Sequence, residues 1–246
     1  MYARVFLIFV LSSAFQLEQQ YVVSRTWLQR RRMTAQEWHA PDHNSVVDLA
    51  KSDLRKALAK ANRGFPPVSK EINNEAKRAL KKLIALHDDQ VANNSIAGNW
   101  TLLWTDAPDI LGLATSSGTP VSPIAPHLGR IGQEIDSDAK TIANVIEYKP
   151  PSWLPFKEDS IEQRVILGYE QQDDLVDLTL QGIGLRPIKL FGNSINRQLT
   201  TPKVTLPFGQ FRILFNDGDL RVVQTQQGFF SVNERLRNDD ETSSSS

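Results

Sequence analysis

The chain of 246 residues contains no cysteine. This absence excludes a disulfide framework, a thiolate metal site and a cysteine nucleophile. A net charge is lacking as well, because 28 basic residues balance 28 acidic ones. Hydrophobic residues make up 40% of the chain, a share that favours a globular protein over a disordered one. The length allows one sizeable domain with extensions.

Catalytic and cofactor motifs are also missing. The four histidines have no metal-ligand spacing, and the Ser-rich stretch "ATSSGT" lacks a G-x-S-x-G elbow. The "GIG" at 182–184 is not followed by a helical pattern, as a dinucleotide fingerprint requires. Asp217 and Asp219 lie beside Arg221, which should lower both pKa values and make them unsuited to general acid catalysis. We expect no enzyme activity, no cofactor and no metal.

The charges are unevenly distributed along the chain. Residues 51–82 contain ten Lys and Arg against three Asp and Glu, whereas residues 83–246 contain 13 against 21. The basic segment is most simply a solvated helical face, and attraction to an anionic membrane surface is the functional alternative. Nucleic acid is not an expected partner, because the acidic body would repel phosphate and no recognition motif is visible.

The first residues resemble a targeting signal. Arg4 precedes an apolar run at 5–11, and Ser12 and Ala14 stand at −3 and −1 of a possible cleavage site, which predicts a signal peptide over 1–14. A buried helix or membrane anchor is the alternative. The "SAF" junction and the Arg-bearing segment 15–43 resemble the signal-plus-transit presequence of algae with complex plastids. That resemblance implies import into a plastid, with ordinary secretion as the competitor.

Two helices are predicted next, over 45–62 and 69–89. Ser45 with Asp48, and Ser69 with Glu71, are placed to begin them. The second helix has one apolar stripe, which is most simply a docking face against the rest of the domain. An amphipathic membrane helix is the alternative, although no Trp or Phe anchors the stripe.

From Gly98 the hydrophobic period changes to two, which predicts strands. The expected strands lie at 100–105, 131–135, 141–148, 164–169, 175–180, 210–215, 220–225 and 229–234, with a weaker one at 203–206. Eight or nine short strands without intervening helices favour an antiparallel β-barrel or sandwich. The tail 237–246 has a disordered composition.

Two Pro-rich segments, 106–130 and 149–157, are predicted to be loops. The second carries Trp153, Leu154 and Phe156 among three prolines. Apolar side chains on such loops would line a portal or touch a membrane, or they would fold back over one end of the barrel.

Four stretches occur in the order found in the plastid lipid-associated protein (PAP), or fibrillin, family. They are "RGFPPVSKEINNEAKRALKKLIALHDD", "GNWTLLWTDAPDILG", "IGQEID" and "FNDGDLRVVQTQQGFFSVNER". The resemblance covers about residues 44–236 and is carried by a set of motif residues: Gly98, Trp100, Asp217, Asp219, Leu220, Arg221, Gly228 and Arg235. Gln224–Thr225 stands where the family often has Arg-Gly, and Phe229 where it has a small residue.

Resemblance to this family implies a mainly β fold, a lipocalin-like antiparallel β-barrel of 8–9 strands preceded by two α-helices. It also implies a peripheral association with plastoglobules or thylakoids. The expected partners are hydrophobic small molecules such as carotenoids, quinones, prenyl-lipids and acyl lipids. No enzymatic activity is generally assigned to the family.

Strand alternation then predicts which residues face the lumen. One face of each of two strands should form an apolar wall and contact a ligand: Trp100, Leu102, Trp104, Phe211, Ile213 and Phe215. A structural coat on plastid lipid bodies, with a filled barrel, is the second hypothesis, and a lipid-modifying enzyme in a barrel is the third.

The corner "FNDGDLR" has three possible explanations: an active site, an anion hook or a structural latch. The first and last strands of such barrels meet, which should bring Trp100 near Arg221 or Arg235. A guanidinium over the indole would stabilise the contact by roughly 0.5–2 kcal/mol. Asp217 or Asp219 could hold that guanidinium through charge-assisted hydrogen bonds. We favour the latch.

Overall fold

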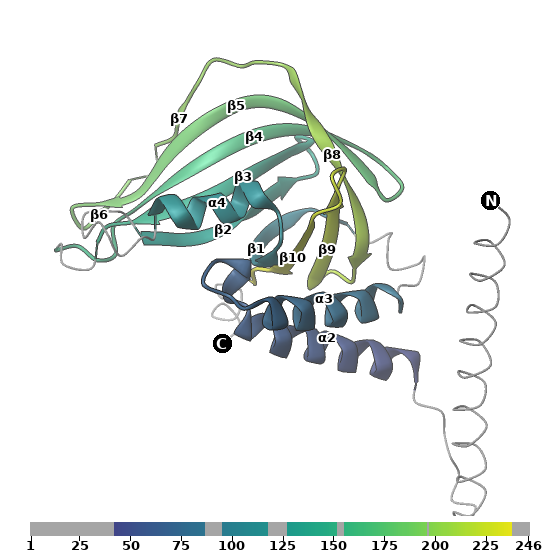
Figure 1. The fold of residues 1–246 in the computed structure, drawn as a ribbon. Coiled ribbons are helices and arrows are strands. Elements are labelled where there is room, and N and C mark those ends of the chain that lie inside the picture. Colours follow the sequence, from purple (N-terminus) through teal and green to yellow (C-terminus); the bar gives the residue numbers. More distant parts are fainter. Residues whose placement is uncertain (1–41, 87–94, 118–126, 152–154, 196, 238–246) are drawn as a thin grey trace, which may run out of the picture. The chain divides into compact units, whose positions relative to one another are not determined.

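A computed structural model describes residues 42–86, 95–117, 127–151, 155–195 and 197–237 (Figure 1). Contacts divide the chain into two units, residues 1–45 and 46–246, and the account below concerns the second. The predicted signal peptide, residues 15–41 of the transit-like segment and the tail from residue 238 lie outside the described residues, as do Trp153 and Leu154.

Both predicted helices are confirmed. They are α2 (His43–Lys60) and α3 (Lys70–Ile84), separated by the short 3-10 turn η1 (Asn62–Gly64). Ser69 begins α3 as expected, because its Oγ accepts the Ile72 N–H at 3.3 Å. The Ser45 hydroxyl instead donates to the Asp42 carbonyl oxygen, since α2 begins two residues before the predicted start. None of the described helices is long and apolar enough to cross a membrane.

The rest of the unit is an antiparallel sheet of ten strands. They are β1 (Gly98–Thr105), β2 (His127–Asp136), β3 (Thr141–Lys149), β4 (Ser160–Gln172), β5 (Leu175–Leu190), β6 (Asn193–Ser194), β7 (Leu199–Thr200), β8 (Leu206–Asn216), β9 (Leu220–Thr225) and β10 (Phe230–Arg235). The eight strongly predicted strands are confirmed. β5 runs ten residues past its expected end, and β6 and β7 were not predicted.

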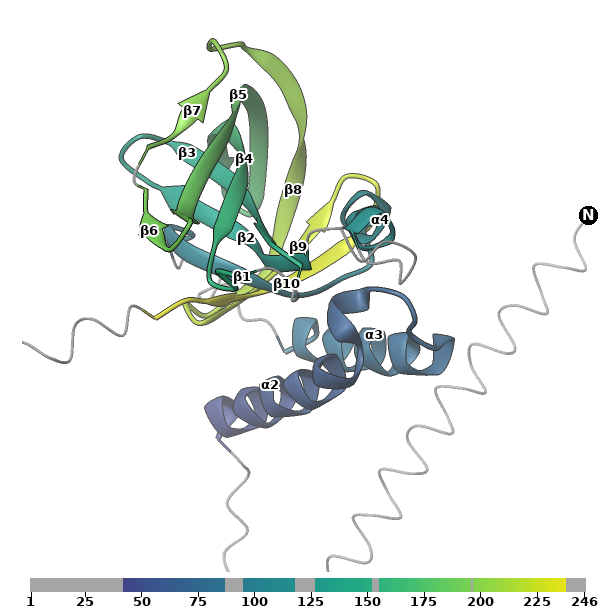
Figure 2. The same ribbon diagram turned by 90° about the vertical axis from the view of Figure 1, so that its left-hand side faces the viewer.

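The pairing order shows how the sheet closes. It runs β4-β3-β2-β1-β10-β9-β8-β5, and β5 also pairs with β4. The two ends of the order are therefore joined, and the strands form a ring (Figure 2). β6 and β7 pair with the far part of β5. The expected mainly β fold, an antiparallel ring preceded by two helices, is confirmed.

The expectation that 106–130 is one long loop is wrong. Residues Pro108–Ser117 form the helix α4 between β1 and β2. Ile110 and Leu111 on α4 pack against a small cluster that contains Leu102 and Ile131. Pro108 is tolerated because the first turn of a helix needs no amide donor there. Tertiary packing, rather than the Gly- and Ser-rich composition, decides this segment.

The apolar core has two main parts on opposite sides of the sheet wall. One lies between the helices and the sheet, where Leu54 and Leu80 pack against Trp104 and Val232. The other lies inside the ring, and its members come from seven strands and the segment before β1: Ile96, Trp100, Ile135, Ile142, Leu167, Tyr169, Val176, Phe211, Ile213 and Val223. The apolar stripe of α3 is therefore a docking face against the sheet, as expected.

Candidate functional site

The six predicted ligand contacts lie in three different clusters. Trp100, Phe211 and Ile213 are buried inside the ring. Leu102 packs with the cluster under α4, and Trp104 and Phe215 pack beneath α2 and α3. The expectation that each strand presents its three residues on one face is wrong for Trp104 and Phe215.

Two β-bulges explain this difference. The pairing of β1 with β10 shifts between Leu102 and Trp104, and the pairing of β8 with β9 shifts between Ile213 and Phe215. An extra residue at each bulge reverses the alternation of side chains beyond it. Both shifts direct an aromatic side chain from the ring interior to the helices.

Trp100 is the centre of the predicted motif, and the structure brings both arginines to it. The guanidinium carbons of Arg221 and Arg235 each lie 4.4 Å from the centre of the indole ring. Arg235 is the cross-strand partner of Trp100 and donates to the carbonyl oxygens of Gly218, Ala97 and Ser95. The indole N–H donates to Ile96 O at 2.8 Å.

Gly98 is required at this place for two reasons. Its φ of +116° is unfavourable for a residue with a side chain, and a Cβ there would collide with the Arg235 guanidinium. The first-strand glycine and the last-strand arginine of the motif therefore fit each other.

Arg221 is fully buried. It donates to the Oε1 of Gln133, while its Nε and Nη1 have no hydrogen-bond partner among the described residues. Burial and the neighbouring charge of Arg235 lower the pKa of Arg221 to about 9. The two stacked guanidiniums and the indole tie β1, β9 and β10 together.

The expectation that Asp217 or Asp219 holds a stacked guanidinium is wrong. Asp217 accepts the backbone N–H groups of Asp219 at 3.0 Å and Leu220 at 2.7 Å, and it pairs with Lys51 of α2. Asp219 pairs with the exposed Arg237 at 3.3 Å. Burial alone would raise the pKa of Asp217, but the Lys51 and backbone hydrogen bonds lower it.

These contacts favour the latch among the three explanations of the corner. Asp217 stabilises the turn between β8 and β9, where Gly218 supplies the positive φ of +92°, and it fastens that turn to α2. Leu220 continues into the core under the helices. Gly228 has a φ of +89° in the next turn, between β9 and β10.

A different set of apolar residues is left exposed, on the face that lines the ring interior. Val165, Leu178 and Leu180 pack against the interior cluster. Opposed residues in an antiparallel ladder point to the same face. Ile183 is opposite Val165, Leu185 is opposite Gln163 and Leu199, and Leu206 is opposite Leu180.

The exposed fractions of these side chains are large. They are 44% for Ile183, 50% for Leu185, 58% for Leu199 and 56% for Leu206, and Ile161 on the same face of β4 is 38% exposed. We call these five residues the open apolar face. Contiguous exposed apolar side chains of this kind mark a site for a ligand, a partner or a membrane.

Charged residues occupy the opposite face of β4 and β5, and they form ion pairs with residues of β2. Glu162 pairs with Arg186 at 2.6 Å and with Arg164 at 3.1 Å, and Glu134 pairs with Arg130 at 2.8 Å. Burial alone would raise the pKa of Glu134, but the Arg164 and Arg130 hydrogen bonds hold it at about 2 instead of 4.5. Strand alternation places these charges on the face opposite the open apolar face.

The open apolar face was missed because it depends on the far half of β5. The alternation of "GIGLRPI" carries the signal for a continuing strand. Pro187 argues against a central strand, and the partners at 199 and 206 cannot be inferred from local sequence. No cluster of His, Cys, Asp and Glu that could hold a metal occurs in the part of the chain that the structure describes.

Comparisons with known proteins identify the family. The PAP_fibrillin family model matches residues 48–232, which contain most of α2, all of α3 and nearly the whole ring. Neither a search of curated proteins nor a search of solved structures found a match. The family is plastid-localised, lipid-associated and non-enzymatic in general. The chain belongs to the PAP/fibrillin family, and is a plastid lipid-associated protein in the general sense of that family.

Proposed function

We propose that the protein binds a hydrophobic small molecule, such as a carotenoid, quinone, prenyl-lipid or acyl lipid, at plastoglobules or thylakoids. The observation that carries the proposal is the open apolar face. Five aliphatic side chains on the inner face of the ring remain between 38% and 58% exposed, although the same face is buried further along β4, β5 and β8.

The energetics favour a ligand there. Removing apolar surface from water contributes about 25 cal/mol per Å2, or about 1.5–3 kcal/mol for a fully covered Leu or Ile side chain. The predicted contacts Trp100, Phe211 and Ile213 would form the floor beneath such a ligand. Trp104 and Phe215 would act indirectly, by fixing the wall on which the helices pack.

The first experiment identifies the ligand. Lipids and pigments that co-purify with the protein extracted from its source are identified by mass spectrometry. We expect a stoichiometric apolar compound. A protein that carries none, and whose melting temperature is unchanged by added quinones, carotenoids and fatty acids, would contradict the proposal and favour the structural coat.

A pair of substitutions tests the position of the site. Leu185→Asp with Leu199→Asp places two charges on the open apolar face and should reduce ligand affinity by at least about tenfold. Leu49→Asp is the control for a charge placed on an exposed Leu elsewhere, because Leu49 is 59% exposed but lies on α2. Equal affinities for the double variant and the control would place the ligand elsewhere.

A further inference from the structure

The segment that carries four of the five residues of the open apolar face has an unusual charge composition. Residues 178–216 contain no Asp or Glu and five Lys or Arg. Within them, every described residue from 197 to 209 is exposed. Arg197 and Lys203 form no ion pair with any residue that the structure describes. Three of the five basic residues are ion-paired, Arg186 with Glu162, Lys189 with Glu158 and Arg212 with Asp174. The positive charge left on the connection from β5 to β8 is therefore that of Arg197 and Lys203.

The same connection and the start of β8 expose large apolar side chains. Phe191 is 76% exposed, and Val204 and Phe208 are 39% and 48% exposed. We call Phe191, Arg197, Lys203, Val204 and Phe208 the basic apolar surface. A combination of protruding apolar groups with unpaired cations fits a lipid surface, because the apolar groups enter the acyl boundary while the cations meet anionic headgroups.

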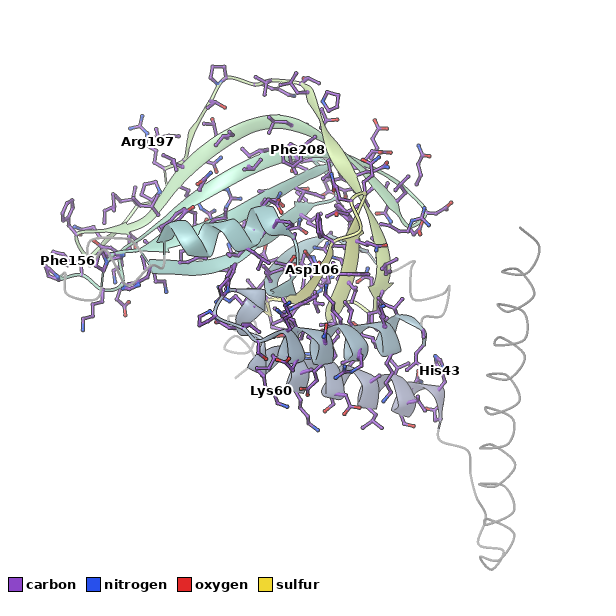
Figure 3. The ribbon with its side chains drawn as sticks, in the orientation of Figure 1. His43, Lys60, Asp106, Phe156, Arg197 and Phe208 are labelled. Atoms are coloured by element: carbon purple, nitrogen blue, oxygen red, sulfur yellow. The ribbon has the colours of Figure 1, made fainter. Side chains whose placement is uncertain are left out.

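The position of this surface is separate from the helices. Figure 1 and Figure 2 show β7 and the start of β8 on the side of the ring away from α2 and α3. Figure 3 places Arg197 and Phe208 on that side and Lys60 on the helices. Most apolar residues of α2 and α3 pack against the sheet. Leu49 of α2 is the one large apolar side chain of these two helices that is exposed, so the helices have no comparable apolar face to offer a membrane.

Local contacts hold one end of the surface in place. Phe191 packs edge-on against Phe156, with ring centres 6.2 Å apart. Asp159 accepts the backbone N–H groups of Phe191 at 2.6 Å and Gly192 at 3.0 Å. Both aromatic rings are exposed, although each lies within a turn fixed by hydrogen bonds. Glu158 is paired with Lys189 at 3.5 Å, which offsets its negative charge at this end.

We propose that the basic apolar surface docks the protein on a lipid surface that carries anionic headgroups. In the docked protein the open apolar face would lie beside the lipid. An apolar molecule could then pass from the lipid to that face without crossing water. Only the transfer of an apolar molecule to the open apolar face rests on the proposed function. Docking on the lipid surface does not, so either proposal can fail without the other.

Vesicle sedimentation tests the docking surface. The purified protein is mixed with vesicles of phosphatidylcholine, with and without phosphatidylglycerol, at several salt concentrations. We expect stronger binding to the phosphatidylglycerol vesicles and weaker binding as salt rises. Arg197→Glu with Lys203→Glu should lower the partition coefficient by at least about tenfold.

The matched control reverses two helix charges instead. Lys56→Glu with Lys81→Glu makes the same change in formal charge on α2 and α3, where both side chains are exposed. The control should bind like the wild type. An equal or larger loss in the control would overturn the proposal and assign attachment to the helices, and so would unchanged binding by the Arg197 and Lys203 variant.

Three further outcomes are decisive. A wild type that binds neither vesicle, or both equally, would overturn the docking proposal. So would a dimer in size-exclusion chromatography that Phe191→Ala with Phe208→Ala dissociates, because the surface would then be covered by a second copy. Co-purified lipid is measured in every variant: its absence from the wild type contradicts the proposed function alone, whatever the vesicles show.

Discussion

The two sides of the ring use similar apolar side chains in opposite ways. On the side covered by α2 and α3, Trp104, Phe215 and Val232 are at most 1% exposed. On the side formed by β5, β7 and the start of β8, Leu185, Leu199 and Leu206 are half exposed. The covered side resembles an ordinary protein core, whereas the uncovered side keeps apolar area available.

The difference separates stability from function within one sheet. Burial of the covered side supplies the free energy that holds the ring closed, and the Lys51–Asp217 pair fastens α2 to it. The uncovered side contributes little to folding, because its residues stay in water. Substitutions on the covered side should therefore lower stability. Substitutions on the uncovered side should weaken ligand or lipid binding with little effect on stability.

The largest expected effect is on the covered side. Trp104→Ala should reduce the free energy of unfolding by about 3–5 kcal/mol, because it removes a fully buried indole and leaves a cavity. Urea denaturation measures the change. A loss below about 1 kcal/mol would show that the helices do not pack on this side as described.

A pair of glycine substitutions compares a crowded position with an open one. Gly98→Ala should cost about 2–3 kcal/mol more than Gly209→Ala, because only Gly98 faces Arg235. Both have positive φ, at +116° and +130°, and nothing lies within 4 Å of a Cβ at Gly209. Thermal or urea unfolding of both variants provides the comparison. Equal losses of stability would mean that the positive φ alone accounts for the cost and that the contact with Arg235 adds nothing.

The latch should depend on both carboxylate oxygens of Asp217. Asp217→Ala should cost about 2 kcal/mol, since it removes the turn hydrogen bonds and the Lys51 pair. Asp217→Asn keeps one acceptor and should cost about half as much. If the two variants are equally stable, the turn hydrogen bonds contribute nothing beyond the ion pair.

The pH dependence of stability tests the ion pairs on the face of β4 and β5 opposite the open apolar face. The pKa of Glu134 is about 2 in the folded chain and 4.5 otherwise, so its contribution to stability is present above pH 4.5 and is lost as the pH falls toward 2. With allowance for solvent at this partly exposed group, we expect about 1–2 kcal/mol. Glu134→Gln should flatten the acid limb of a stability-versus-pH curve, and an unchanged slope would assign it to other carboxylates.

The smallest effect belongs to the uncovered side. Leu206→Ala should change stability by no more than about 0.5 kcal/mol, because the side chain is already 56% exposed. The same substitution should weaken ligand binding. A stability loss as large as that of Trp104→Ala would show that Leu206 is part of the core and that the comparison between the two sides is wrong.

Part of the site was accessible from sequence, and part was not. The meeting of Trp100 with Arg221 and Arg235 follows from the motif and from the closure expected of the family. The placement of Trp100 and Trp104 on opposite faces of the sheet does not follow from the sequence. A β-bulge adds one residue between them, and a prediction from strand alternation assumes that no bulge is present. The same reason moved Phe215 from the expected wall to the helix interface.

Sequence alone determined the helices, the eight main strands, the absence of cysteine chemistry and the latch residues, since these depend on local periodicity and on side-chain types. Only the tertiary structure decided that α4 forms, that β5 continues past Pro187, and that Leu185 lies opposite Leu199. Those features arise from contacts between residues far apart in the chain, whose free energy no local pattern records. The open apolar face belongs to this second group, because exposure is a property of what the rest of the fold leaves uncovered.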